Sequence, residues 1–288
     1  MEDLLAPTWH KRSVARELMA FQNRSFAAKL IGMFDKLYKE ANTPARAQGH
    51  PLRGEIEKLV HDETGTLIKL RFNTLNPPCC MPIMGNSNHV LTSMRVPNIY
   101  LEQETTFLEA VKKKKNAVGG FDAKRGKLTG IYSEIEAPVW MSWTYIRSYF
   151  SPEESAGVLM HEVGHCSLSF QFMFRNYRAS QILASLHQIR TGRDQSLTYE
   201  AAIKIAGEEL CNNPLEFERM VDIKNDKALA TIVYTRTWAQ LGNDFGDISV
   251  TGPNFEALAD NYAARWGFAE PLATALYTLY GAQGLGAD

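Results

Sequence analysis

The sequence lacks any long uninterrupted apolar run, and no window of it approaches the roughly 18 consecutive apolar residues that indicate a transmembrane helix. Its first twelve residues hold five ionisable side chains, among them His10, Lys11 and Arg12, and no apolar stretch. A secretory signal peptide needs such a stretch, so none is expected. We therefore predict a soluble protein without a transmembrane segment.

Cysteine is scarce and net charge is almost absent. The chain has only four cysteines in 288 residues: Cys79, Cys80, Cys166 and Cys211. So few cysteines in a chain of this length do not build a disulfide framework, and the adjacent Cys79 and Cys80 lack the C-x-x-C spacing of a metal pair. We expect four reduced thiols in a cytoplasmic protein. The net charge of −1 predicts neither a nucleic-acid partner nor a charged-membrane partner.

Periodicity along the chain predicts an α+β fold that is mainly helical with a small sheet. Residues 13–41 show a 3.6-residue apolar period, which predicts a long helix, and residues 67–72 alternate after a turn at Gly65, which predicts a strand. Residues 73–98 are rich in Pro, Asn and Met and predict an irregular loop. Four glycines in residues 119–130 mark the expected border between an N-terminal region (1–120) and a catalytic region (121–288).

A second alternating segment covers residues 131–142. It contains Pro138, which has no N–H to donate to a sheet, so we predict an edge strand just before the next helix. An exposed edge could bind an extended substrate by adding its backbone as a further strand. It could equally close the core and do nothing else, and the sequence leaves both possibilities open.

The most informative segment reads His161-Glu162-Val163-Gly164-His165. On a helix, residues four apart lie on one face, so both imidazoles can reach one metal ion. Glu162 stands about 100° round the helix from His161, close to the metal but off the ligand face. That position suits a general base that takes a proton from a water activated by the metal.

The segment before this motif is a strong helix start. Ser151 can cap the helix, Pro152 fits its first position, and acidic residues follow in the first turn. The apolar flanks of the motif predict a buried helix that continues to about Phe172. Gly164 inside it costs up to about 1 kcal/mol relative to Ala, so we expect a close neighbour or a substrate beside it.

Catalytic zinc usually takes three protein ligands, so a third must lie downstream. The metzincin pattern requires Gly and His where this chain has Leu168 and Gln171, and the thermolysin-like pattern requires an acid that residues 182–188 lack. His187 is the one metal-competent residue in that stretch.

Two pairs of acids at helical spacing remain, Glu218 with Asp222 and Glu256 with Asp260. We favour Glu256, because it lies in an Ala-rich helix that starts at a proline and stops at Gly267, whereas Glu218 stands among charged residues. Asp260 shares the face of Glu256 and can hydrogen-bond the outer nitrogen of a ligating imidazole.

H-E-V-G-H followed by E-A-L-A-D resembles the gluzincins of the HtpX and CAAX prenyl endopeptidase type, whose signature is H-E-x-x-H…E-x-x-A-D. The resemblance covers the order of elements over residues 130–280 and is specific at the two motifs. It implies a zincin-like fold, Zn²⁺ bound by His161, His165 and Glu256, Glu162 as the base, and Asp260 as the residue that orients a ligand. Unlike the best-known members, this chain has no membrane helices.

The resulting hypothesis is a zinc metalloendopeptidase that hydrolyses peptide or protein substrates. Gluzincins also use a donor for the oxyanion of the transition state, and the candidates here are Tyr262, Arg265, His187 and Tyr234. The alternative is a non-catalytic module that keeps zinc as a structural or protein-binding element. Structural zinc sites usually have four closed ligands rich in Cys, and they have no need of Glu162.

Overall fold

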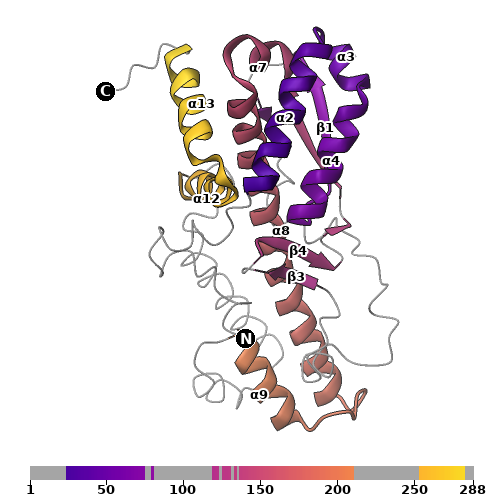
Figure 1. Ribbon diagram of the computed structural model, residues 1–288. Coiled ribbons are helices and arrows are strands. Elements are labelled where there is room, and N and C mark those ends of the chain that lie inside the picture. The colour runs from indigo at the N-terminus through magenta and orange to yellow at the C-terminus, as the bar shows by residue number, and fades with distance from the viewer. Residues whose placement is uncertain are drawn as a thin grey trace.

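Helices make up most of the structure, and a three-stranded and a two-stranded sheet lie among them (Figure 1). The computed structural model describes residues 24–74, 79–80, 119–122, 125–130, 133–134, 136–210 and 253–282. The protein is therefore α+β and mainly helical, as the sequence predicts. The helices of its N-terminal part are α2 (Arg24–Glu40), α3 (Pro44–Gly49) and α4 (Pro51–Thr64). The strands are β1 (Ile68–Asn73), β2 (Cys79–Cys80), β3 (Gly119–Asp122), β4 (Lys127–Gly130) and β5 (Ala137–Ser142).

The helices that follow the sheets are α7 (Trp143–Tyr149), α8 (Pro152–Arg190), α9 (Tyr199–Leu210), α12 (Pro253–Ala263) and α13 (Ala269–Ala282), with the π-helical turn η5 (Ala264–Phe268) between the last two. The predicted helix over residues 13–41 is present as α2 within the described residues. It ends where predicted, and the Thr43 side chain then accepts a hydrogen bond from Arg46 N to begin α3.

The three-stranded sheet places β5 between β1 and β2, so the prediction of an edge strand at Pro138 is wrong. β5 runs parallel to β1, with Pro138 opposite Lys69, and antiparallel to β2. The N–H of Ala137 points at β1, where it donates to Leu67 O, so the ring nitrogen of Pro138 faces the other side. On that side β2 pairs only with Trp140 and Met141. Proline is tolerated in this central strand because its nitrogen, which has no hydrogen to donate, lies outside the part of β5 that pairs with β2.

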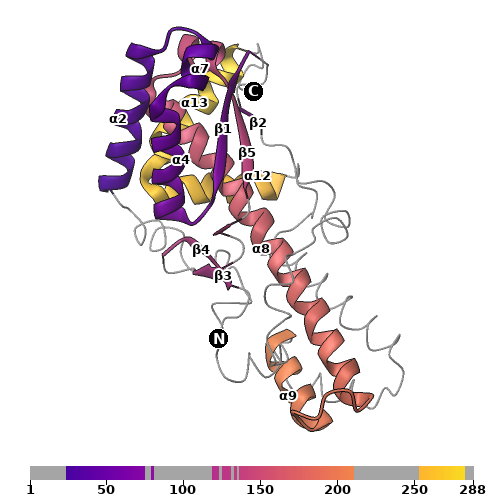
Figure 2. The same ribbon diagram turned by 90° about the vertical axis from the view of Figure 1, so that its right-hand side faces the viewer.

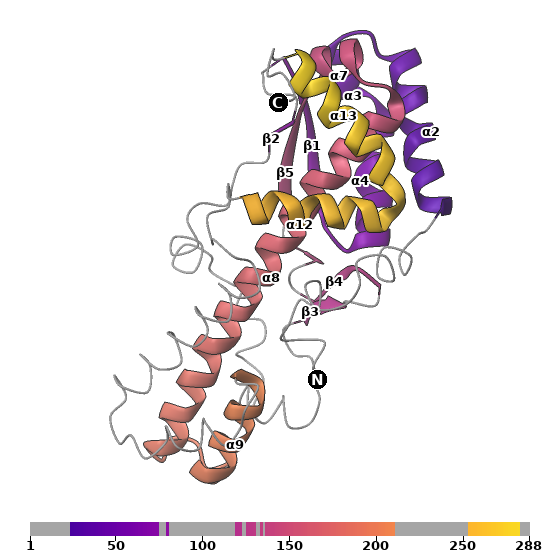
Figure 3. The ribbon, with the colours of Figure 1, turned by 90° about the vertical axis from the view of Figure 1, so that its left-hand side faces the viewer.

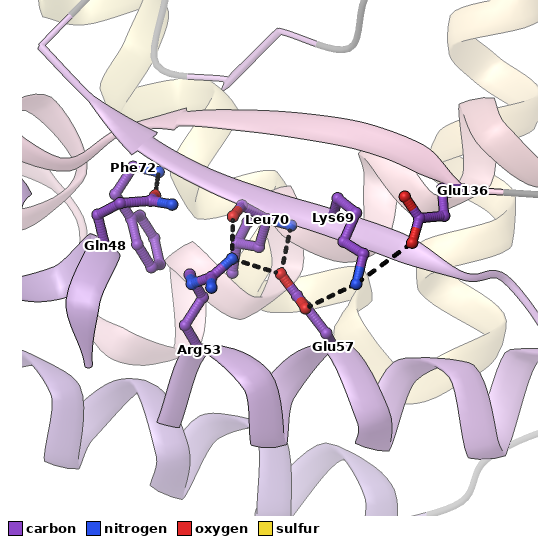
Figure 4. A network of polar contacts seen from close by, with 7 residues as sticks. All are labelled: Gln48, Arg53, Glu57, Lys69, Leu70, Phe72 and Glu136. Atoms are coloured by element: carbon purple, nitrogen blue, oxygen red, sulfur yellow. Dashed lines mark hydrogen bonds and ion pairs between the residues drawn. The ribbon is translucent and has the colours of Figure 1, made fainter. Parts of the chain in front are cut away.

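Side chains from α3 and α4 cover the outer edge of β1 (Figure 4). Gln48 Oε1 accepts from Phe72 N at 2.8 Å, and Glu57 Oε1 accepts from Leu70 N at 2.9 Å. Arg53 donates both to Glu57 and to Leu70 O. Backbone groups that a further strand would otherwise pair with are therefore satisfied by side chains.

The turn before β1 requires glycine. Gly65 ends α4 with a left-handed φ of 70°, and a Cβ there would lie 2.1 Å from Leu128 O of β4. The glycine thus lets the chain enter β1 and lets the β3–β4 hairpin approach the end of α4.

Helix α8 carries the H-E-x-x-H motif and is longer than the sequence predicts. Ser151 and Glu154 form a reciprocal capping box at its start, as expected, but its 39 residues continue to Arg190 rather than ending near Phe172. Figure 2 shows α8 leaving the part of the molecule that holds α2, α4 and the sheet and ending beside α9. Leu186 and Ile189 of α8 are buried near that end, and so are Ala202 and Ile203 of α9. The end of α8 therefore packs against α9.

Helix α12 lies across α8, and α13 then turns back along the first half of α8 (Figure 3). The turn is made at Gly267, whose φ of 94° is open to glycine and strained for other residues, so the predicted stop at this residue is confirmed.

One hydrophobic core contains side chains from both sides of the predicted border near residue 120. Phe34 of α2, Leu70 of β1, Val139 of β5 and Leu159 of α8 belong to it. The predicted N-terminal and catalytic regions therefore share a sheet and a core in the described residues. Among these residues, no helix combines the length and hydrophobicity that a membrane crossing requires.

Candidate metal centre

The first half of α8 brings His161 and His165 to the same face, because they are four residues apart on one helix. Their rings meet edge to face, and the two Nε2 atoms lie 3.0 Å apart. Both side chains are almost enclosed, with exposed fractions of 12% and 10%. Two largely enclosed imidazoles whose Nε2 atoms converge are suited to sharing one cation.

Glu256 reaches this point from α12. Its Oε2 lies 3.2 Å from His161 Nε2 and 3.3 Å from His165 Nε2. The three donor atoms form a nearly equilateral triangle, and the group is close enough to bind a metal ion. The Glu256 side chain is 50% exposed, so the centre is open to solvent on the α12 side.

Asp260 lies one turn further along α12 and contacts the opposite edge of the His161 ring. Its Oδ1 is 2.8 Å from His161 Nδ1. A carboxylate at Nδ1 holds the ring orientation and leaves the lone pair of Nε2 directed at the metal position. The structure thus brings together His161, His165, Glu256 and Asp260 as the sequence suggests, while the roles assigned to them remain predictions.

The charges around His161 change its pKa. Burial alone would lower it, but hydrogen bonds to Asp260 and Glu256 and the charge of Glu162 outweigh burial and raise the pKa to about 9. Hydrogen bonds from both histidines in turn hold the pKa of Glu256 far below its ordinary value. The centre is therefore an electronegative cluster that favours a cation, whether a proton on His161 or a metal ion.

Glu162 is buried directly after His161 and is not one of the three converging donors. Its charge reaches His161 on one side and Cys166 on the other. Burial, with a contribution from Glu162, raises the pKa of the Cys166 thiol well above its ordinary value. Cys166 is not among the converging donor atoms, so the donor set is two imidazoles and a carboxylate.

Two candidates for an oxyanion donor, Tyr262 and Arg265, lie three residues apart at the end of α12 and in η5, and His187 lies elsewhere. His187 is exposed in the last turn of α8, about 33 Å along the helix from His165 at 1.5 Å per residue, so the structure does not bring it to the centre. Tyr262 is buried, and its hydroxyl donates its one hydrogen to Gly126 O at 3.4 Å. Arg265 is buried in η5. The alternative acids Glu218 and Asp222, and Tyr234, lie outside the described residues.

Ala259 is a residue of this region that the sequence analysis did not single out. It is fully buried, and its backbone lies against Gly164 of α8, where a Cβ on Gly164 would be 3.0 Å from Ala259 Cα. The expected close neighbour of Gly164 is therefore α12 itself. The sequence does contain a signal for this contact, because Gly164 and the alanines of α12 have side chains small enough to let two helix backbones touch.

No protein-family profile, curated protein or solved structure matches this chain. The function must therefore be inferred from the geometry of the centre.

Proposed function

We propose that this protein is a zinc-dependent metallopeptidase with a zincin-like fold, of the gluzincin type. The observation that carries the proposal is the triangle of His161 Nε2, His165 Nε2 and Glu256 Oε2, with sides of 3.0, 3.2 and 3.3 Å. Two of its corners come from an H-E-x-x-H helix, and the third comes from a residue almost a hundred positions away.

The size and chemistry of the triangle fit zinc. A tetrahedral Zn²⁺ ion with bonds of about 2.0–2.1 Å places its ligand atoms about 3.3–3.4 Å apart, close to the distances found here. Two imidazole nitrogens and one carboxylate oxygen favour zinc over magnesium or calcium, which bind mainly oxygen. Three protein ligands and an exposed side leave room for a water or a substrate, as catalytic sites do and closed structural sites do not.

When bound at this centre, zinc would lower the pKa of a water molecule and polarise a carbonyl group. Glu162 supplies the proton transfer that peptide hydrolysis needs. Its carboxylate accepts a proton as the water oxygen bonds to the peptide carbon, and it returns that proton to the nitrogen as the C–N bond breaks. Asp260 holds the His161 ring through Nδ1 during both steps.

The decisive experiment measures zinc content and peptide hydrolysis in parallel. The purified full chain should carry about one zinc and cleave casein, and Glu162→Gln should keep the zinc and lose nearly all activity because only the proton acceptor is removed. Glu153→Gln is the matched control, since it makes the same change at an exposed position of the same helix. It should behave as the wild type.

The same experiment separates catalysis from the alternative of a non-catalytic zinc module. Zinc at full occupancy, with no cleavage of casein or of a peptide library by the wild type, would favour that module. Zinc content near zero after purification without chelators would overturn both hypotheses.

A further inference from the structure

Helices α8 and α12 touch at Gly164. A Cβ added to Gly164 would lie 3.0 Å from both Cα and O of Ala259 and 3.1 Å from Tyr262 Cβ. Two of these atoms belong to the backbone of α12 and cannot rotate away, so any side chain at residue 164 would push the two helices apart.

This contact lies the same number of residues after one ligand residue on each helix. Gly164 follows His161 by three residues on α8, and Ala259 follows Glu256 by three residues on α12. His161 and Glu256 therefore each stand about one helical turn before the point where the helices meet, and His165 directly follows Gly164. The separation of the two backbones at Gly164 consequently sets how far Glu256 Oε2 lies from the imidazoles, which is now 3.2 and 3.3 Å.

We propose that Gly164 is a positioning residue of the metal centre, and this inference rests on the proposed function. It acts through α12, since the absence of a side chain lets α12 approach until Glu256 and Asp260 reach the histidines. Metal–ligand distances tolerate a change of about 0.2 Å, whereas relieving a contact at 3.0 Å requires a shift of a few tenths of an ångström. An added methyl group should thus separate the acids from the histidines enough to weaken binding.

The same helix provides a matched control. Gly157 is also buried, and a Cβ there would lie 3.0 Å from Leu272 N and 3.3 Å from Leu272 Cα of α13. Gly157→Ala therefore forces a backbone contact of the same kind, with the same change in helix propensity. Because α13 carries none of the converging donor atoms, this variant should disturb packing and leave Glu256 in place.

The test compares zinc affinity and stability for the wild type, Gly157→Ala and Gly164→Ala as full chains. Affinity is measured by competition with a chromogenic chelator, stability by urea unfolding without metal, and coordination by the visible absorption of the Co²⁺-loaded protein. Both variants should lose similar stability. Only Gly164→Ala should lose zinc affinity, by about 10–100-fold as for other changes around a metal ligand, and alter the cobalt spectrum.

A second variant covers the case in which Gly164→Ala does not fold. Glu256→Asp withdraws the carboxylate by one methylene at a half-exposed position, so it should fold and still lose at least about tenfold in zinc affinity. The positioning role would be overturned if Glu256→Asp bound zinc as tightly as the wild type. It would also be overturned if the two alanine variants had equal zinc affinities and equal cobalt spectra. Either result would leave the zinc site itself intact. A wild type that binds no zinc would overturn the metal centre itself.

Discussion

His161 Nδ1 and Asp260 Oδ1 lie 2.8 Å apart although 99 residues separate them in the chain. This contact fixes which nitrogen of His161 faces Glu256, because a ring that donates Nδ1–H to a carboxylate keeps its lone pair at Nε2. The arrangement of the three donor atoms thus depends on a residue that contributes none of them.

Asp260→Ala should lower zinc affinity or peptidase activity by about 10–100-fold. Asp260→Asn should lower it less, because the amide oxygen still accepts the hydrogen bond and only the charge is lost. Zinc titration and casein cleavage check the order. Equal effects of the two substitutions would mean that the hydrogen bond contributes nothing beyond the charge.

Glu256→Ala should weaken zinc binding more than either Asp260 variant, because it removes a donor atom rather than its support. Glu218→Ala is the informative control, since Glu218 has the same four-residue spacing to an aspartate. Zinc content after dialysis measures both. Loss of zinc in Glu218→Ala with retention in Glu256→Ala would exchange their roles.

Glu57→Ala should destabilise the fold by about 2–3 kcal/mol without changing zinc affinity. It removes the buried acceptor of Leu70 N and leaves Arg53 without this carboxylate, and hydrogen bonds to charged groups are worth about 1.5–3 kcal/mol. Glu57→Gln keeps an acceptor oxygen and should cost less. Urea unfolding measures the loss, and the exposed Glu55→Ala on the same helix should stay within about 0.5 kcal/mol of the wild type.

Tyr262 should make the fold sensitive to alkaline pH. Burial raises its pKa from 10.0 to about 12, so the hydroxyl stays neutral in the fold at a pH where it ionises in the unfolded chain. Its contribution to stability is complete below pH 10 and is lost as the pH rises to about 12, by up to about 3 kcal/mol.

Tyr262→Phe should abolish that part of the alkaline loss and cost about 1 kcal/mol at neutral pH, since the bond to Gly126 O disappears. Unfolding in urea at pH 8 and pH 11 measures both effects. Tyr277→Phe, at a side chain that is 76% exposed, should change neither. An alkaline loss in Tyr262→Phe as large as in the wild type would contradict the assignment.

Local features could be predicted because local rules govern them. The cap at Ser151, the left-handed turn at Gly65, the strand β1 and the stop at Gly267 all follow from residues within a few positions. The meeting of two histidines of α8 with two acids of α12 could be predicted, because each pair has the i, i+4 spacing that places both side chains on one helix face. That the group binds a metal ion stays a prediction.

The rest depends on contacts that a local pattern does not contain. β5 is a central strand only because β2, a strand of two residues, pairs with it. Pro138 is compatible with that position because the register pairs β2 with Trp140 and Met141 instead. The far end of α8 packs against α9, a helix that follows it in the chain, and no pattern within α8 itself contains this contact. Tyr262 is a donor by its chemistry, but tertiary packing directs its hydroxyl to Gly126.

The side chains that cover the outer edge of β1 have a consequence for the order of folding. Glu57 and Gln48 lie 13 and 24 residues along the chain from their partners in β1. Lys69 and Pro138 are paired residues of β1 and β5, and the chain between them is almost three times as long as the 24 residues between Gln48 and its partner. Short loops close faster and at lower entropic cost than long ones. We therefore expect α3, α4 and β1 to assemble while β5 is still being synthesised. During translation β1 would then expose one edge rather than two to neighbouring chains.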